Sequence, residues 1–528
     1  MQATNSRLVL SPSDLNDYVE CAHLTTLALE VARGVRRRPH VPDDHGDLLR
    51  RKGEEHEAAY LAELRAKGRQ VVDVIGADRW DFDSSARATI EAMRAGAEII
   101  YQATFVLGDW RGRADFLERI DQPTALGPWG YEALDAKLAR AEKPTYVLQL
   151  CFYTEAIASI QQVTPSAMHV LLGIGERRTL RHADFDAYYR RVRTGFLSAL
   201  GRAAATEPYP VEHCALCEFR DVCDERWKLE DHLALVAGIR RGQVTRLRSA
   251  GIGTLAQLAQ APATPVPHVA PHTLETLHDQ AGLQLHRRTT GNLDWHPLPV
   301  EPGRGFERLP RSSSGDVMFD IEGDPFWEPA RGLHFLFGLL TEDDGAWRYR
   351  TIWAHDRAGE RQAFEALVDF FHERLARHAD MHVYHYGAYE PTALKQLMGV
   401  YATREDAVDA LLRGEVFVDL HSVVRQGLRA GVPGYSLKDV EALPAFRRQS
   451  GVTSGTRAVL ARQVPGARGA RGLLLDGHLE RRGRATHPRL PLLPQSPQRR
   501  RLARDVPGLH RRQPAPPRVT RARSSRCV

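Results

Sequence analysis

Four of the six cysteines form a pattern that ties the start of the chain to a point far downstream. Cys21 lies near the start, whereas Cys214, Cys217 and Cys223 form a C-x-x-C-x5-C group in the segment EHCALCEFRDVCDERW. Three close thiolates and one remote thiolate can complete a four-sulfur metal site. Closing so long a loop with metal would pin the first helix onto the end of the same domain, so this pattern strongly constrains the fold.

The spacing of these cysteines leaves the kind of centre open. Zinc accepts four cysteines, or three cysteines with one histidine, and His213 stands beside Cys214. An iron-sulfur cluster accepts four cysteines, and unligated buried thiols are the third interpretation. Cys151, in an apolar segment, is interpreted as a core residue. Cys527 lies in the Arg-rich segment and is not counted among the candidate ligands. So few cysteines in 528 residues exclude a disulfide scaffold and predict a reducing, cytoplasmic location.

Net charge does not identify a ligand here. The chain carries +6 overall, but residues 461–528 hold 17 Arg and three acidic residues, a net charge of +14. Residues 1–460 therefore carry 55 basic and 63 acidic residues, a net charge of −8. No apolar run approaches the roughly 18 residues of a membrane span, and the start MQATNSRLVL lacks the blocks of a signal peptide. We expect two or three packed domains and no membrane partner.

The first half reads as an α/β domain. Capping residues and apolar spacing predict helices over 11–34, 52–68, 144–160 and 187–202. Alternating apolar and polar residues predict strands over 112–120, 131–140, 166–175 and 177–185.

The second half is predicted to form a second α/β block, followed by a segment of biased amino-acid composition. Residues 235–260 predict two short helices joined at Gly251-Ile252-Gly253, which is either a phosphate-binding turn or an ordinary helical hairpin. From residue 316 a βββαβ order predicts a ribonuclease H-like sheet. After residue 460 there is no Tyr, Phe, Trp or Lys, so we expect disorder. A frameshifted reading of GC-rich DNA and a natural basic tail are the two interpretations of that composition.

A first group of polar residues suits phosphodiester hydrolysis, which needs a divalent cation, carboxylates and a polarised water. Asp115 lies on one predicted strand, and the next carries Asp135-Ala136-Lys137. Residues two apart on a strand face the same side, so Asp135 and Lys137 can share a site. Alone, D-x-K is also typical of a charged surface strand.

Three further residues strengthen this interpretation. Gln149 and Tyr153 lie one helical turn apart on the predicted buried helix, and His56 lies on an earlier helix. Singly, His56 is typical of a surface residue and Gln149 of a core amide. Together with the D-x-K pair, they resemble the PD-(D/E)XK nucleases of the RecB type, including the CRISPR-associated exonucleases. The resemblance covers roughly residues 9 to 230.

The resemblance implies a restriction-endonuclease-like fold and a metal-dependent active site. His56, Asp115 and Asp135 would bind Mg²⁺ or Mn²⁺, and Lys137 would activate or orient the attacking water. Asp at position 135 is within the pattern that the family name allows.

The resemblance also implies roles for the helix pair and the cysteines. Gln149 and Tyr153 would position the nucleic acid strand. The four cysteines would hold a [4Fe-4S] cluster that is structural and supports DNA binding, with zinc as the alternative. They are Cys21, Cys214, Cys217 and Cys223.

A second group of acids lies in the ribonuclease H-like block. Asp320 and Glu322 end its first strand and resemble the first motif of the DEDD exonucleases, where acids hold two metal ions. Glu390 stands where that family usually has Asp, and the expected last motif has no match after residue 460. Asp419 is a substitute ligand or, more typically, a capping residue. We therefore expect a folded, truncated remnant here, without nuclease activity.

The predicted organisation has five parts. They are a RecB-type nuclease domain with its metal clamp (9–230), a helix-hairpin-helix-like region (231–290), a linker (291–315), a truncated ribonuclease H-like exonuclease domain (316–460) and the Arg/Pro-rich end (461–528).

This order resembles a family of RecB-like nucleases and predicts a hydrolase that cuts single-stranded DNA or DNA ends in repair, recombination or related processing. No G-x-x-x-x-G-K-[ST] motif is present, so unwinding would need a helicase from another chain. The alternatives are a silent iron-sulfur scaffold that binds DNA or a helicase, and an RNase or DNase that works through the second domain.

Overall fold

The computed structural model describes residues 1–4, 7–39, 44–76, 78, 80–201, 206–262, 264–328, 331–444 and 459. The predictions for residues 461–528 lie outside these described residues.

A six-stranded mixed sheet forms the first domain, in the order β3-β4-β5-β6-β7-β8. Its strands are β3 (Val71–Asp73), β4 (Ile99–Leu107), β5 (Trp110–Ile120), β6 (Gly130–Lys137), β7 (Ala167–Leu172) and β8 (Arg177–Arg181). Strand β5 is antiparallel to both β4 and β6, and β7 is antiparallel to β8. The pairs β3–β4 and β6–β7 run parallel. A short hairpin of β1 (Gln2–Thr4) and β2 (Arg7–Val9) precedes the sheet.

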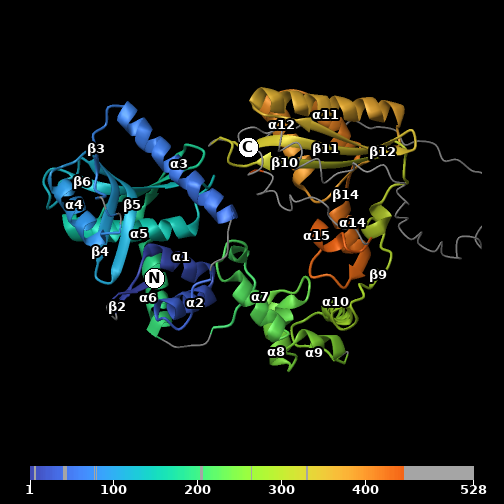
Figure 1. Cartoon of the computed structure of the whole chain (residues 1–528), viewed down its shortest axis with the longest axis horizontal. Coiled ribbons are helices and arrows are strands. Elements are labelled where there is room, and N and C mark those ends of the chain that lie inside the picture. The colour runs from blue at the N-terminus through green and yellow to red at the C-terminus, as the bar shows by residue number, and fades with distance from the viewer. Residues whose placement is uncertain are drawn as a thin grey trace, which may run out of the picture. The chain divides into compact units, whose positions relative to one another are not determined.

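Helices cover both faces of this sheet (Figure 1). They are α1 (Pro12–Glu20), α2 (Ala22–Ala32), α3 (Asp44–Ala66), α4 (Phe82–Arg94), α5 (Pro144–Gln161) and α6 (Asp186–Gly201). The larger core packs α1, α4, α5 and α6 on one face, where Leu148 and Phe152 of α5 are fully buried. A smaller cluster packs α3 on the other face around Phe116. This sandwich fixes α3 and α5 on opposite sides of β5 and β6.

The predicted helix over residues 11–34 is in fact two helices. Cys21 separates α1 from α2 with an extended backbone, φ −158° and ψ 109°. The prediction of one continuous helix was therefore wrong at this residue. The break turns the chain, so that Cys21 packs with Leu24, Leu27 and Phe219.

A helical region follows the first domain. Its elements are α7 (Arg220–Leu229), α8 (Arg241–Ser249), α9 (Leu255–Gln260) and α10 (Pro271–Thr290). Leu233, Leu247, Leu258 and Leu277 form its core.

The second sheet has five strands in the order β12-β11-β10-β13-β14. Its strands are β10 (Val317–Asp324), β11 (Leu333–Asp343), β12 (Ala346–Trp353), β13 (Val383–His385) and β14 (Phe417–Asp419). The associated helices are α11 (Arg357–Arg377), α12 (Tyr389–Tyr401), α13 (Glu405–Arg413), α14 (Leu420–Gly427) and α15 (Leu437–Val440), and β15 (Leu428–Ala430) pairs with β9 (Trp295–Pro297). The meander β10-β11-β12 followed by α11 and the parallel strand β13 confirms the predicted βββαβ order.

A fully buried carboxylate fastens the loop between β10 and β11 to α11. Glu360 accepts hydrogen bonds from Arg331 at 2.8 Å, from the His334 amide at 2.5 Å and from Tyr401 at 2.5 Å. Burial alone would raise the pKa of Glu360, but these partners lower it to about 2. The loop that follows the strand of Asp320 is therefore held by charge-assisted hydrogen bonds.

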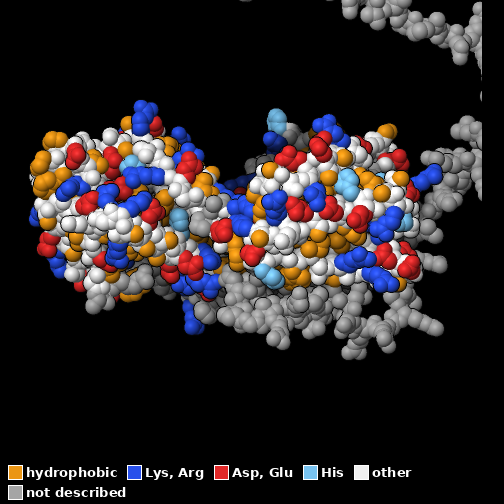
Figure 2. Space-filling model, turned by 90° about the horizontal axis from the view of Figure 1, so that it is seen from above, with side chains coloured by type: hydrophobic (Ala, Val, Ile, Leu, Met, Phe, Trp, Pro, Cys, Tyr) orange, Lys and Arg blue, Asp and Glu red, His pale blue; other side chains and the backbone are white. Residues whose placement is uncertain are grey.

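The surface mixes charges of both signs. Figure 2 shows Lys and Arg side chains scattered among Asp and Glu on the face in view. No helix in the described part of the chain is both long enough and apolar enough to span a bilayer.

Candidate nuclease sites and the cysteine cluster

The first candidate site lies where β5 and β6 separate. These strands pair as far as Phe116 and Leu134, and beyond that pair the backbone amides donate hydrogen bonds to carboxylates. The amide of Asp115 donates to Asp135 Oδ1 at 3.3 Å, and the amide of Ala136 donates to Asp115 Oδ2 at 2.8 Å. Side chains thus replace the backbone ladder and hold the two acids side by side.

Electrostatics couple these acids to Lys137. Burial and the charge of Asp135 raise the pKa of Asp115 well above its ordinary value, while Lys137 opposes this rise. Lys137 Nζ lies 3.0 Å from Asp135 Oδ2. Burial alone would lower the pKa of Lys137, but the charges of Asp135 and Asp115 raise it. The neighbouring carboxylates therefore favour the protonated form of Lys137.

Helix α5 supplies Gln149 and Tyr153. Tyr153 is 4% exposed, and its hydroxyl donates to the carbonyl oxygen of Arg113 at 2.8 Å. Arg113 lies two residues before Asp115 on β5, so this bond holds the strand against α5 beside the acids. Gln149 lies one turn before Tyr153 and is half-buried.

Helix α3 supplies His56 and its neighbour Glu57 from the other face of the sheet. His56 Nε2 is buried and makes no hydrogen bond. Glu57 accepts a hydrogen bond from Gln102 Nε2 on β4, and its charge contributes to the raised pKa of Asp115. The sequence pattern does not single out Glu57, because the acidic run GEEHE is typical of a solvated helix face. Its place beside His56 is the one signal that points to it.

These residues suit a divalent cation in kind. Carboxylate oxygens and an imidazole nitrogen are ligands for Mg²⁺ or Mn²⁺. Asp135 is 1% exposed, and its Oδ2 makes no hydrogen bond of good geometry despite the ion pair with Lys137. Among the described residues no group of three or more His, Cys, Asp or Glu side chains is preassembled as a metal site. At this site Lys137 and the Ala136 amide already engage the carboxylates.

The four cysteines with ligand-like spacing border one small pocket. Cys21 lies between α1 and α2, Cys214 lies in the turn Glu212–Ala215, Cys217 follows that turn, and Cys223 lies on α7. The fold therefore brings the remote cysteine to the other three. The five cysteines within the described ranges, including the buried Cys151, are free thiols.

Burial and neighbouring thiols raise the pKa of two cysteines of this cluster. Burial, followed by the other cysteines, raises the pKa of Cys223 to about 12. Burial and the same neighbours also raise the pKa of Cys217. Deprotonating all four would bring like charges together, which a bound cation relieves. The set fits a thiolate-binding metal in kind, and His213 borders the same pocket.

The second candidate site lies on β10 and at the start of α12. Crowding by neighbouring atoms and the charges of Glu322 and Glu390 raise the pKa of Asp320 to about 7, although its side chain keeps solvent access. Burial raises the pKa of Glu322, which the charge of Lys438 opposes. Glu390 is 4% exposed, and its Oε2 makes no hydrogen bond. The charges of Glu322 and Glu390 therefore act on Asp320.

Asp419, a candidate substitute ligand, is a capping residue. It accepts hydrogen bonds from the amides of His421 at 3.0 Å and Gly387 at 2.9 Å, and from Ser422 Oγ at 2.5 Å. Because both carboxylate oxygens are engaged, Asp419 fastens the start of α14 to the end of β13.

The two glycines between α8 and α9 serve the geometry and the hydrogen bonding of the turn itself. Gly251 has a φ of +83°, which favours glycine, and the Gly253 amide donates to Gln257 Oε1 at 2.7 Å. That amide is already satisfied within the protein. The geometry therefore favours the ordinary hairpin over a phosphate-binding turn.

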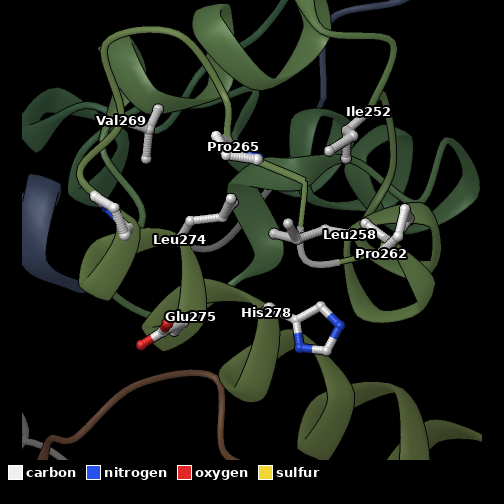
Figure 3. A pocket seen from close by; sticks show the side chains of 10 residues that line it. Ile252, Leu258, Pro262, Pro265, Val269, Leu274, Glu275 and His278 are labelled. Carbon is white, nitrogen blue, oxygen red and sulfur yellow. The ribbon is translucent and has the colours of Figure 1, made fainter.

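An apolar pocket of about 290 Å³ lies beside this hairpin. Figure 3 shows Ile252, Leu258 and Leu274 around it, with Glu275 and His278 of α10 at its edge. It shares no residue with either group of acids.

Comparison with known proteins gives two family matches. Residues 24–224 match the PD-(D/E)XK nuclease superfamily, and residues 317–464 match the RNase H superfamily. No curated protein matches the chain. A solved structure described as the crystal structure of SSO0001 is similar over 42% of this chain and 89% of that chain. The sequence identity between the two chains is 12% and the TM-score is 0.23. The matches confirm the predicted fold class: the chain contains a PD-(D/E)XK nuclease superfamily domain followed by an RNase H superfamily domain, and these indicate a nuclease.

Proposed function

We propose that this protein is a divalent-metal-dependent DNA nuclease of the RecB type that acts on single strands or DNA ends. The observation that carries the proposal is the Asp115–Asp135 pair with Lys137 at the point where β5 and β6 separate. All three residues fall within the segment that matches the PD-(D/E)XK superfamily. Cytoplasmic location and a role in DNA repair or recombination are further parts of the proposal.

Each residue has a role that follows from its surroundings. His56, Asp115 and Asp135 would hold Mg²⁺ or Mn²⁺, which when bound supplies charge neutralisation at the phosphate and polarises a water. Lys137, whose protonated form the neighbouring carboxylates favour, would orient the attacking water and stabilise the negative charge that develops on the phosphate.

Gln149 and Tyr153 of α5 would act beside Lys137. Tyr153 holds β5 in register through the Arg113 carbonyl. Gln149, half-buried on the same helix, would contact the nucleic acid strand.

The test is Mn²⁺-dependent digestion of end-labelled single-stranded DNA by the full chain. Wild type is compared with Asp115→Ala and Lys137→Ala. Asp47→Ala is the control, because Asp47 is exposed on α3 and pairs only locally with Arg50. We expect wild type and the control to cut and the two site variants to fail. Equal inactivity of all four folded proteins would overturn the proposal and favour a scaffold that binds DNA or recruits a helicase supplied by another chain.

We further propose that the four cysteines bind a [4Fe-4S] cluster that supports DNA binding, with zinc as the alternative. The pocket that the four cysteines share supports a metal that binds thiolates. Iron, sulfide and zinc analysis of anaerobically purified protein distinguishes the two. Brown colour lost on oxidation favours the cluster, and stoichiometric zinc without iron refutes it.

A second candidate function is a nuclease that works through Asp320, Glu322 and Glu390. The closeness of these acids favours it, because two-metal hydrolysis needs clustered carboxylates. Cleavage of RNA or DNA that persists in Lys137→Ala and is lost in Asp320→Asn would support this function.

A further inference from the structure

A larger pocket lies beside the cysteine cluster. Its volume is about 540 Å³, which falls within the roughly 300–1,000 Å³ of pockets that hold small organic molecules. Three parts of the chain line it: residues 18–23 around the break between α1 and α2, residues within 206–211, and Arg241 at the start of α8. The pocket shares no residue with either group of acids.

This pocket and the cysteine cluster have a wall in common. Cys21, Tyr209 and Val211 line both the larger pocket and the small one that the four cysteines border. The Val211 amide also donates to Cys214 Sγ at 3.4 Å. The contacts that fix the cysteines therefore fix one side of the larger pocket as well.

Hydrogen bonds hold the segment after α6 in place from two sides. Thr206 Oγ1 lies 2.7 Å from Nδ1 of the buried His23 and donates to Thr26 Oγ1 at 2.8 Å. On the other side, Trp227 Nε1 of α7 donates to the carbonyl oxygen of Pro208 at 2.9 Å. The protein itself therefore shapes the pocket, and such preorganisation lowers the entropic cost of binding a ligand.

Arg241 gives the pocket a positive charge. Its guanidinium carbon lies 5.5 Å from the centroid of the Tyr209 ring, a cation–π contact that orients the group. In the described part of the chain Arg241 forms no ion pair, so its N–H donors remain available to a ligand. Of the described acids that line the pocket, Glu207 is already paired with Arg248, and Glu20 is exposed.

This combination of groups suits a nucleotide. The planar fork of a guanidinium matches two phosphate oxygens, so Arg241 can bind the phosphate. Tyr18 and Tyr209 are half-buried, and tyrosine rings are surfaces on which bases of single strands stack. The carboxylate of Glu20 can accept a hydrogen bond from the amino group of cytosine. Because Glu20 offsets the charge of Arg241, a bare phosphate is a poorer match than a nucleotide.

We infer that this pocket holds one nucleotide of single-stranded DNA apart from the cleavage site, with Arg241 on its phosphate and a tyrosine on its base. The inference rests on the proposed function and deepens it, because it names a place where the strand is held. It also gives the cysteine cluster a defined connection to DNA binding, which is their common wall.

The experiment measures binding of labelled oligo(dC) of about 12 nucleotides, a length typical of single-strand sites, to the full chain. Fluorescence anisotropy is recorded over a range of salt concentrations without added divalent cations, so that binding is separated from cleavage. Wild type is compared with Arg241→Gln and Tyr209→Leu. The matched control is Arg246→Gln, because Arg246 is exposed on the same helix and lies outside the lining.

We expect Arg241→Gln to weaken binding about tenfold, since hydrogen bonds to charged groups have this strength. The slope of log affinity against log salt should also fall by about 0.7, the value for one phosphate contact to a single strand. Tyr209→Leu should weaken binding about tenfold with an unchanged slope, because stacking and not charge is lost. Arg246→Gln retains the same Arg-rich residues 461–528, and it should bind like wild type.

Photo-crosslinking locates the contact directly. Oligonucleotides that carry iododeoxycytidine should crosslink to Tyr18 or Tyr209 in wild type, and this crosslink should weaken in Arg241→Gln. Equal affinity and salt slope in Arg241→Gln and Arg246→Gln, together with crosslinks that map only elsewhere, would overturn this inference while wild-type cleavage upholds the proposed function. A wild type that neither binds nor cuts single-stranded DNA would overturn the proposed function itself.

Discussion

Replacement of Asp115 by Asn is expected to stabilise the metal-free protein and abolish cleavage. Asp115 lies against Asp135, and burial together with that charge raises its pKa. Asn keeps an oxygen that can accept the hydrogen bond from the Ala136 amide and removes one negative charge. The substitution therefore separates the role of Asp115 in the fold from its role in the site.

The magnitude follows from Coulomb's law. Two like charges about 4 Å apart repel by about 4 kcal/mol at an effective dielectric constant of about 20. The substitution also loses the attraction between Asp115 and Lys137, which offsets much of this gain. We expect a net rise of about 1–2 kcal/mol in the free energy of unfolding, or roughly 2–4 °C in Tm for each kcal/mol.

The effect has a defined pH dependence. The folded-state pKa of Asp115 lies above its unfolded value, so wild type gains stability as pH falls through the folded pKa toward the unfolded one. The advantage of the Asn variant should be largest above the raised pKa and should shrink on acidification.

Urea unfolding in EDTA at mildly alkaline and mildly acidic pH measures both effects. Asp121→Asn, at an exposed position just after β5, controls for loss of a surface carboxylate. Added Mn²⁺ should stabilise wild type and not Asp115→Asn. A variant that is less stable than wild type in EDTA, or that gains equally from Mn²⁺, would refute the electrostatic reasoning.

Three further expectations follow. Tyr153→Phe removes the donor to the Arg113 carbonyl, so it should cost about 1–2 kcal/mol in urea unfolding and slow cleavage; an unchanged midpoint would show that the bond contributes nothing. Cys21→Ser should lower both the metal bound per chain and the Tm, whereas Cys151→Ala, in the core, should lower the Tm alone. Elemental analysis measures the metal and calorimetry measures the Tm. Equal loss of metal in both variants would contradict the assignment of Cys21 as a ligand. Folding lowers the pKa of Glu360 from 4.5 to about 2, so this carboxylate contributes roughly 3 kcal/mol to stability above pH 4.5, and the contribution is lost as pH falls to about 2. Glu360→Gln should therefore flatten the acid unfolding transition measured by circular dichroism. An identical transition in the variant would exclude the Glu360 network as its cause.

Local patterns in the sequence predicted much of the architecture. Alternation and capping predicted the strands of Asp115 and Asp135 and the buried helix of Tyr153, because burial of one face dictates that periodicity. The α/β class, with a PD-(D/E)XK domain followed by a ribonuclease H-like domain, is confirmed by the family matches. The roles assigned to individual site residues remain predictions.

Periodicity failed where a tertiary contact overrides local preference. Cys21 interrupts a helix that apolar spacing predicts to be continuous, because its side chain packs against a segment far along the chain. Gln102 has a φ of +57° within strand β4, and its amide donates a hydrogen bond to Glu57 on α3. Neither break leaves a signal in the neighbouring residues.

The sequence by itself determined the order of the two superfamily domains, the D-x-K strand and the spacing of the cysteines, since these depend on residue types at short range. The tertiary structure alone decided that Asp135 forms an ion pair with Lys137 and that the Tyr153 hydroxyl donates a hydrogen bond to the Arg113 carbonyl on β5. Such features depend on burial and on distances between elements that are remote in sequence. Charge interactions and hydrogen bonds depend on distances in space, so they can be identified only in the folded chain.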